Sequence, residues 1–211
     1  MQILSTNIAQ PTIIIWRGQE VLTGIYKYGV NTPIFLNSED VDNDHVLDRR
    51  YHGGADKACY FYSADHYPFW KMKYPDLDWN WGMFGENLTV SGLNESDVRI
   101  GDRFQIGGAI VQVSQPRQPC FKLGVRFGDQ KVVDDFWNLP FPGVYVRVLR
   151  PGNVAKGDRF TLLESNPDSL SVSQVFSIFR SSRTDIELIK KAIEESFLAE
   201  SCRKDIQKLL K

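Results

Sequence analysis

The sequence predicts a mainly β fold with helical additions, followed by a small unit of three helices at the carboxyl end. Short runs of β-branched and aromatic residues, separated by Gly, Pro, Asn and Asp, recur through the first 164 residues, as expected for many short strands. All 16 glycines, all five tryptophans and all eight tyrosines lie before Glu164. The spacing of apolar residues then changes to that of amphipathic helices. These observations predict a β domain over residues 1–164 and a helical domain over residues 165–211.

The strands of the first domain follow from runs of high β propensity that end at turn residues. So many short strands leave exposed edges unless the sheet closes or two sheets stack, which favours a barrel or a sandwich. Two helices are expected between strands, at residues 64–74, where Pro68 suits the first turn, and at residues 121–127. The expected strands are residues 12–16, 20–28, 34–36, 58–62, 88–90, 103–106, 109–114, 144–149 and 159–163.

Three helices are expected in the second domain. The first and second have apolar residues three and four positions apart, and Thr184 and Glu187 match a capping box at the start of the second. Helices this short are marginal alone, so they are expected to pack on one another, on the β domain or on a partner. Their apolar residues are Val172, Val175, Phe176 and Phe179 in the first, Ile186, Ile189, Ile193 and Phe197 in the second, and Ile206, Leu209 and Leu210 in the third.

Charge and composition narrow the classes of function. The 25 Lys and Arg balance 26 Asp and Glu, so no overall field attracts nucleic acid or an anionic membrane, and any anion site must be local. No apolar run is long enough to span a membrane, and the amino terminus does not resemble a signal peptide. Three widely separated cysteines favour reduced thiols and a cytoplasmic protein, with core packing expected for Cys59 and Cys202.

A pattern suited to anion binding surrounds Gly53 and Gly54. Paired glycines allow successive backbone N–H groups to turn toward an anion. His52 and Lys57 add donors or positive charge on either side. The alternative is a glycine turn with a surface ion pair between Asp56 and Lys57.

Glu86 and Asn87 directly precede the expected strand at residues 88–90. At the start of a strand, a carboxylate and an amide would be able to hydrogen-bond the ring nitrogens and exocyclic groups of a heterocycle. The alternative is a turn in which Asn87 bonds the local backbone.

Cys120 is the most suggestive candidate for chemistry. It lies between Arg117 and Lys122 at an expected strand-to-helix turn, and Pro119 suits the first position of the helix. The helix dipole and both cations would favour the thiolate, which can act as a nucleophile or as a ligand for a soft metal. A buried inert cysteine and a cysteine hydrolase that uses His52 are the alternatives.

Other motifs are incomplete. Residues 40–45 begin like a calcium-binding loop, but His45 stands where such a loop needs glycine and Tyr51 where it needs glutamate. We interpret this segment as a solvated acidic loop. The sequence contains no glycine-rich fingerprint for a dinucleotide or a nucleoside triphosphate.

Five segments in this order resemble the MOSC family, whose domains are similar to the C-terminal part of molybdenum cofactor sulfurase. The helical tail is similar to the extension found in the small stand-alone bacterial, YiiM-like branch. The resemblance implies an irregular closed β-barrel of the MOSC type, followed by the three-helix domain. The segments are Thr23–Lys27, His52–Lys57, Phe84–Leu88, Ser114–Leu123 and Pro151–Asp158.

For function, the resemblance implies binding of molybdenum cofactor, with Cys120 as the cysteine ligand to the metal. It also implies reduction of N-hydroxylated bases, such as 6-hydroxylaminopurine, to amines. Because the cofactor carries a phosphate, it needs local cations in a nearly neutral chain. The candidates for that cradle are Lys27, Arg49, Arg50, Lys57, Arg117 and Lys122, with Gly53 and Gly54 as backbone donors. Asp56, Glu86 and Asn87 would contact the pterin, and His52 would move protons or bind phosphate.

The electrons for such a reduction must come from a separate reductase. The chain has no nucleotide fingerprint and too few cysteines for a four-cysteine iron–sulfur cluster. The helical tail is one candidate docking site for this reductase. Packing within the chain or in a homodimer is nevertheless the expected use of its apolar face. A cofactor carrier without turnover and a persulfide sulfur-transfer enzyme are the alternative functions. The second is weakened because the chain has no aminotransferase-like, pyridoxal-phosphate-binding domain.

Overall fold

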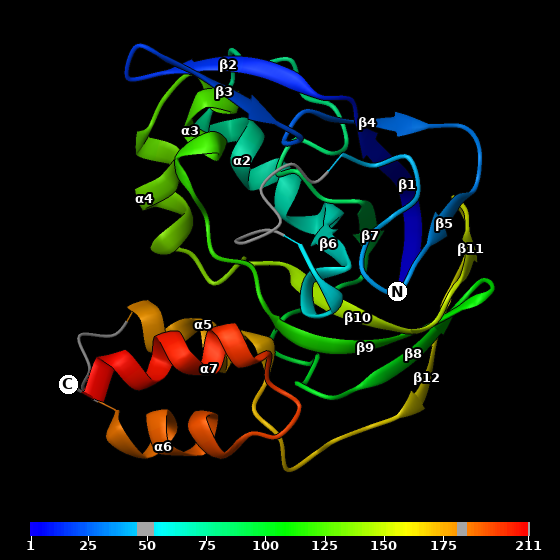
Figure 1. The fold of residues 1–211 in the computed structure, drawn as a ribbon, viewed down its shortest axis with the longest axis vertical. Helices are drawn as coiled ribbons and strands as arrows, with labels where there is room; N and C mark the ends of the chain where they lie inside the picture. The colour runs from blue at the N-terminus through cyan, green and yellow to red at the C-terminus, as the bar shows by residue number, and fades with distance from the viewer. Residues whose placement is uncertain (46–52, 181–184, 211) are drawn as a thin grey trace.

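The computed structural model describes residues 1–45, 53–180 and 185–210. Its main feature is an eight-stranded sheet, which Figure 1 shows on the side of the molecule away from most helices. The strands are β1 (Gln2–Ala9), β4 (Lys27–Val30), β6 (Cys59–Ser63), β7 (Leu88–Ser91), β8 (Arg103–Ile106), β9 (Ala109–Pro116), β10 (Val144–Arg150) and β12 (Phe160–Glu164). Their order is β12-β8-β9-β10-β6-β7-β1-β4, and β6 with β7 is its parallel pair.

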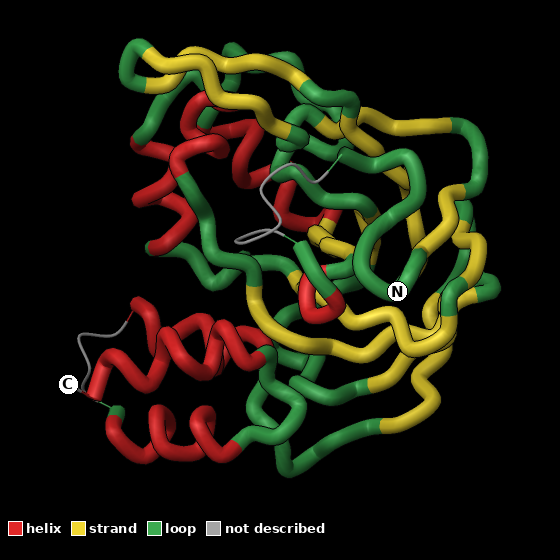
Figure 2. The backbone as a smooth tube through the Cα atoms, viewed as in Figure 1, coloured by secondary structure: helices red, strands yellow, loops and turns green. Residues whose placement is uncertain are grey.

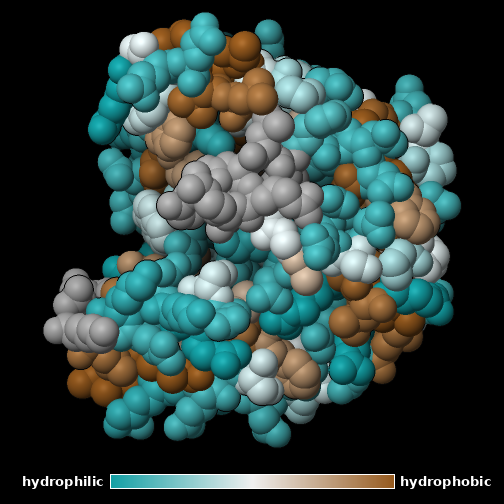
Figure 3. Space-filling model, in the orientation of Figure 1, coloured by the Kyte–Doolittle hydropathy of each residue, from teal (hydrophilic) through white to brown (hydrophobic). Residues whose placement is uncertain are grey.

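Two small antiparallel sheets flank the large one. They are β2 (Thr12–Trp16) with β3 (Gln19–Thr23), and β5 (Ile34–Leu36) with β11 (Gly152–Val154). The apolar patch at the top of Figure 3 lies over β2 and β3, which carry the exposed side chains of Ile13, Ile15 and Leu22.

The helices form two groups, one near the β2–β3 hairpin and one at the carboxyl end (Figure 2). The first group is α2 (Tyr67–Lys73), α3 (Phe121–Phe127) and α4 (Lys131–Trp137), and the second is α5 (Val172–Arg180), α6 (Ile186–Glu194) and α7 (Glu200–Gln207). Short 3₁₀ turns are η1 (Ala55–Lys57), η2 (Ala64–His66) and η3 (Lys208–Leu210). None of the helices in the described ranges is both long and apolar enough to cross a bilayer.

Most expected strands and helices are confirmed to within a few residues, and the mainly β fold is as predicted. The expected strand at residues 20–28 is instead two strands, β3 and β4, with a break at residues 24–26. Gly24 is needed in this break, because a Cβ there would collide with the His45 carbonyl oxygen. Three elements, β1, β11 and α4, were not predicted from the sequence.

Strand pairing leaves the large sheet open between β12 and β4 in the described part of the chain. A single bridge between Gln2 and Arg159 nevertheless brings the start of β1 against the start of β12. Backbone bonds from Ile3 N to Asp158 O and from Gly157 N to Ile3 O, both 2.9 Å, support this approach. The large mainly antiparallel sheet is established, and its closure into a barrel stays a prediction.

The tail helices pack on the sheet, which is one of the three arrangements expected for them. Buried residues of α5, α6 and α7 belong to the same apolar core as the sheet, together with the buried thiols of Cys59 and Cys202. Phe176 of α5 also stacks on Trp137 of α4, with ring centroids 5.2 Å apart. The N-cap of α6 is Asp185, whose carboxylate accepts from Leu188 N. Thr184 lies outside the described residues, and the division into domains at residue 164 stays a prediction.

Candidate functional site

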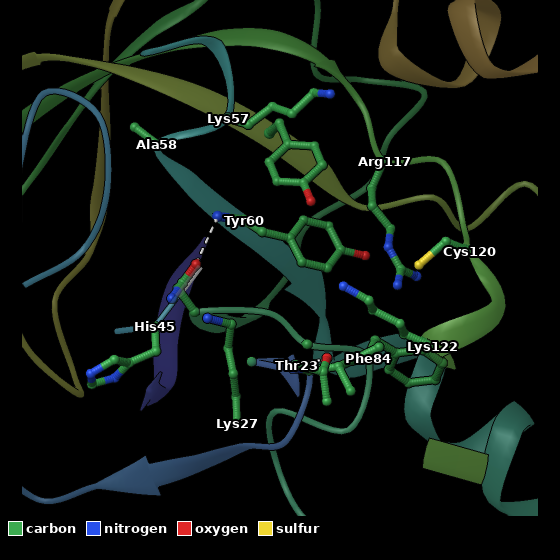
Figure 4. Close-up of a pocket in the computed structure, with 15 residues that line it drawn as sticks. Thr23, Lys27, His45, Lys57, Ala58, Tyr60, Phe84, Arg117, Cys120 and Lys122 are labelled. Atoms are coloured by element: carbon green, nitrogen blue, oxygen red, sulfur yellow. Dashed lines mark hydrogen bonds between the residues drawn. The ribbon is translucent and has the colours of Figure 1, made fainter. Parts of the chain in front are cut away.

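A pocket of about 650 Å³, partly open to solvent, is enclosed by four segments that are distant in the sequence. It lies at one end of the large sheet, where the β3–β4 break, the start of β6, the turn before β7 and the β9–α3 loop converge (Figure 4). Its walls are Thr23, Gly24, Ile25 and Lys27; Lys57, Ala58 and Tyr60; Phe84, Gly85 and Asn87; Arg117, Cys120 and Lys122; and the single residues His45 and Tyr145.

Cys120 is the N-cap residue of α3, and its backbone is extended there. Its carbonyl oxygen accepts from Leu123 N at 2.9 Å, which starts the helix. The side chain is partly exposed, and Figure 4 shows its sulfur beside the Arg117 guanidinium. The structure therefore presents this thiol to the pocket, unlike the two core cysteines.

Arg117 places a cation in the wall of the pocket. Arg117 is 5% exposed, and its guanidinium carbon lies 5.5 Å from the Tyr60 ring centroid and 5.0 Å from the Phe136 ring centroid. Burial alone lowers the pKa of Arg117, but nearby Tyr60 and Tyr145 more than offset it, so its pKa lies above the ordinary value. Its Nη1 is buried without a hydrogen-bond partner among the described residues. A buried cation with an unpaired donor is suited to bind an anion from the pocket.

Two further cations line the same pocket as this thiol. Lys122 lies on the first turn of α3 and is buried. Lys57 is the last residue of η1, and Figure 4 shows it across the pocket from Lys122. Burial lowers the pKa of Lys57, although the negative charges of Asp205 and Asp56 act in the other direction. The pocket is thus cationic around Cys120.

Lys27 is paired within the protein. Its Nζ forms an ion pair with Asp44, which also accepts from Asn87 Nδ2 at 2.9 Å and from Ala9 N at 2.8 Å. The interpretation of residues 40–45 as a solvated loop is therefore wrong for its end, because the Asp44 side chain is 1% exposed and His45 lines the pocket. Much of the charge of Lys27 is neutralised by this pair.

Asn87 lines the pocket with its polar groups already bonded. Its Nδ2 donates to Asp44, and its Oδ1 accepts from Tyr60 N at 3.3 Å. Its side chain therefore joins three segments of the wall, in addition to any contact with a ligand.

Glu86 does not line the pocket. Its carboxylate accepts hydrogen bonds from four donors in and around the turn before β7. Burial raises the pKa of Glu86, and the bonds from Tyr67 and Thr89 act against that rise. These hydrogen bonds fix the conformation of the turn, so the role of Glu86 in this structure is to stabilise it. The donors are Tyr67 Oη at 2.6 Å, Thr89 Oγ1 at 2.8 Å, Gly82 N at 2.9 Å and Phe84 N at 3.1 Å.

Asp56 also points away from the pocket. It forms an ion pair with Arg147, and its second oxygen accepts from Glu200 N at 3.3 Å. These contacts connect η1 to the tail. Gly53 and Gly54 are not part of the lining, although the φ of +89° at Gly54 requires glycine. The predicted site residues Arg49, Arg50 and His52 lie outside the described residues.

Sequence reasoning missed the aromatic wall of the pocket. Tyr60 and Tyr145 are directly paired across β6 and β10, with ring centroids 5.0 Å apart. Burial raises the pKa of Tyr145 to about 12, so both phenols are protonated donors at neutral pH. The register between two strands 85 residues apart carries no local signal that would have identified the pair.

Comparison with known proteins gives consistent matches. The MOSC domain model matches residues 48–161. The protein YflK of Bacillus subtilis is 37% identical over 206 residues, which are 98% of this chain and 93% of that protein. A protein of Gibberella moniliformis named Reductase is 34% identical over 82% of this chain, which corresponds to 31% of its own length. The crystal structure of YiiM from Geobacillus stearothermophilus has a TM-score of 0.83 and 31% identity, covering all of this chain and 99% of that one.

Proposed function

The chain belongs to the MOSC domain family, and from that premise we propose that it is an oxidoreductase that binds molybdenum cofactor. Its proposed reaction is reduction of an N-hydroxylated base to the amine and water, R–NHOH + 2 e⁻ + 2 H⁺ → R–NH₂ + H₂O. The electrons come from a separate reductase. The similar protein named Reductase supports an oxidoreductase, and the substrate class rests on the family resemblance.

One observation carries the proposal: the accessible thiol of Cys120 lies beside the buried, incompletely bonded guanidinium of Arg117 in a cationic pocket. These residues fit the cofactor, because a thiolate is a soft metal ligand and a buried cationic donor suits a phosphate or another anionic group. When bound, the cofactor supplies two-electron redox chemistry at its metal.

The roles of the residues follow from their positions. Cys120 Sγ would hold the metal, while Arg117 and Lys122 would hold the negative charge of the cofactor. Lys57 would donate a proton to a ligand in the pocket that it lines, because burial lowers the pKa of Lys57 and makes it a stronger acid than a lysine in water. His52 keeps its proposed role in proton transfer or phosphate binding. We also propose that the protein is cytoplasmic, where its three free thiols would stay reduced. It is proposed to form a homodimer and to have no nucleic-acid partner.

Turnover by the loaded protein tests this function. The protein, given an artificial reductant and 6-hydroxylaminopurine, is expected to form adenine faster than the free cofactor does. Retained molybdenum without adenine formation would contradict catalysis and favour a cofactor carrier. Mass spectrometry that finds a persulfide on Cys120, with no molybdenum retained, would favour sulfur transfer instead.

Arg117→Met is expected to weaken retention of the cofactor by about tenfold to hundredfold, since a hydrogen bond to a charged group contributes roughly 1.5–3 kcal/mol. Molybdenum remaining after gel filtration measures the retention. In the wild type the retention should also fall with added salt, and in the variant this dependence should be smaller.

Arg126→Met is the matched control. Arg126 is also buried, at 9% exposed against 5% for Arg117, and lies over the rings of Tyr26 and Tyr28, at 5.0 and 5.1 Å. It does not line the pocket, although its Nη2 donates to the backbone oxygen of Lys27 at 3.1 Å. Equal retention in the two variants would refute the assignment of Arg117 to the cofactor.

A further inference from the structure

A second pocket adjoins the first at Cys120. It has a volume of about 870 Å³, is partly open to solvent, and shares Lys57, Cys120, Lys122 and Tyr145 with the first pocket. Its remaining wall comes from the β9–α3 loop on one side and from α7 on the other. Figure 3 shows the surface hollowed between the tail helices and the part of the molecule that carries α3 and α4. The thiol therefore stands on the border between two cavities.

The tail is fixed firmly enough to form a wall. Ala199 N donates to Ser114 O on β9 at 3.0 Å, and Arg147 Nη1 donates to the carbonyl oxygen of Phe197 at 2.7 Å. The bond from Glu200 N to Asp56 adds a third connection. The start of α7 is thus held beside the strand that leads into Cys120.

The sequence of α7 presents polar groups to this second pocket. Cys202 and Ile206 are buried in the core and are four residues apart, so they lie on one face of the helix. Ser201 and Asp205 are also four residues apart, and each directly precedes one of these buried residues. Both line the pocket together with Cys202. The helix therefore buries one face and carries a hydroxyl and a carboxylate on the neighbouring one. The Oδ1 of Asp205 also accepts from Lys208 Nζ at 2.7 Å.

The opposite wall contains an unpaired acceptor. Gln115 is 3% exposed and lines the second pocket, and its Oε1 is buried without a hydrogen-bond partner within the described ranges. Pro119 and Phe121 add apolar surface beside it. A buried amide oxygen without a partner costs free energy unless a donor from a ligand reaches it.

We propose that the second pocket binds the substrate as a neutral, planar heterocycle with N–H donors, between the β9–α3 loop and α7. This assignment rests on the proposed function, in which the first pocket holds the cofactor. Gln115 Oε1 and the Asp205 carboxylate accept from the ring or its exocyclic nitrogen, and Ser201 limits the size of the ligand.

Ser201→Trp tests the assignment by filling the pocket from an exposed helix position. The variant of the loaded protein should bind adenine, the product amine, at least about tenfold more weakly by calorimetry. Its KM for 6-hydroxylaminopurine should rise by a similar factor, while its molybdenum content and its midpoint of thermal denaturation stay at the wild-type values. Gln207→Trp, at an exposed position on the same helix that does not line the pocket, should behave as the wild type.

The outcomes separate this assignment from the proposed function. Unchanged adenine binding and unchanged KM in Ser201→Trp would overturn the substrate pocket, even if the wild type is a reductase. Weaker adenine binding in Ser201→Trp, with no turnover by the wild type, would support the pocket and refute the reductase.

The carboxylate of Asp205 gives a second test. Asp205→Asn should weaken adenine binding several-fold, because an amide oxygen is a weaker acceptor for an N–H donor than a carboxylate. Unchanged adenine binding in this variant would contradict the proposed recognition.

Discussion

Cys120→Ser is expected to reduce adenine formation to the level of a control without enzyme, while the protein stays folded. A serine hydroxyl is protonated at neutral pH and is a hard oxygen donor, so it is a poor substitute for a thiolate on a soft metal. The fold should tolerate the change, because the Cys120 side chain makes no capping hydrogen bond within the described structure and serine is a favoured N-cap residue. Turnover and thermal denaturation together measure the two effects.

Cys59→Ala is the control for loss of a thiol. Cys59 is completely buried in the apolar core, and burial raises the pKa of its thiol, so it should contribute packing and no chemistry. This variant should lose some stability and keep its turnover. A Cys120→Ser protein that turns over at the wild-type rate would remove the thiol from the mechanism.

Glu86→Ala is expected to lower the free energy of unfolding by about 3 kcal/mol, because it leaves four donors near a buried turn without their acceptor. For a chain of this size the midpoint of thermal denaturation should fall by about 6–12 °C. The turn also carries Phe84, Gly85 and Asn87 into the pocket wall, so cofactor retention should fall as well. Calorimetry and molybdenum analysis measure the two losses.

Glu187→Ala is the matched control, since its side chain is 85% exposed in a pair with Lys190. An exposed pair of this kind contributes about 0–1 kcal/mol, so the midpoint should hardly move. If the two variants were equally stable, Glu86 would not be the residue that holds the turn.

Much of the fold could be predicted because its signals are local. The runs that form β2, β5 and β8 match the expected strands residue for residue, as does α3. β1 was missed because three consecutive polar residues, Ser5, Thr6 and Asn7, are all buried, which hides the alternation of a half-buried strand. Asn7 is accommodated there by donating to Thr89 Oγ1 at 3.0 Å and to Glu86 O at 3.2 Å.

The candidate site could be predicted only where its residues are close in the sequence. Arg117, Cys120 and Lys122 lie within one loop and helix start, so their spacing was enough to bring them together. The pairing of Asp44 with Lys27 depends on tertiary contacts that no local pattern carries. The orientation of Glu86 away from the pocket depends equally on the turn around it. Spacing predicted the grouping of residues within one segment, the family resemblance grouped the distant segments, and tertiary packing decided which side chains face the pocket.

Elemental analysis tests the central claim most directly. Wild-type protein purified from a host that makes molybdenum cofactor should contain stoichiometric molybdenum, and Cys120→Ser prepared in parallel should contain almost none. Wild-type protein without molybdenum from such a host, or equal content in the two proteins, would contradict the account.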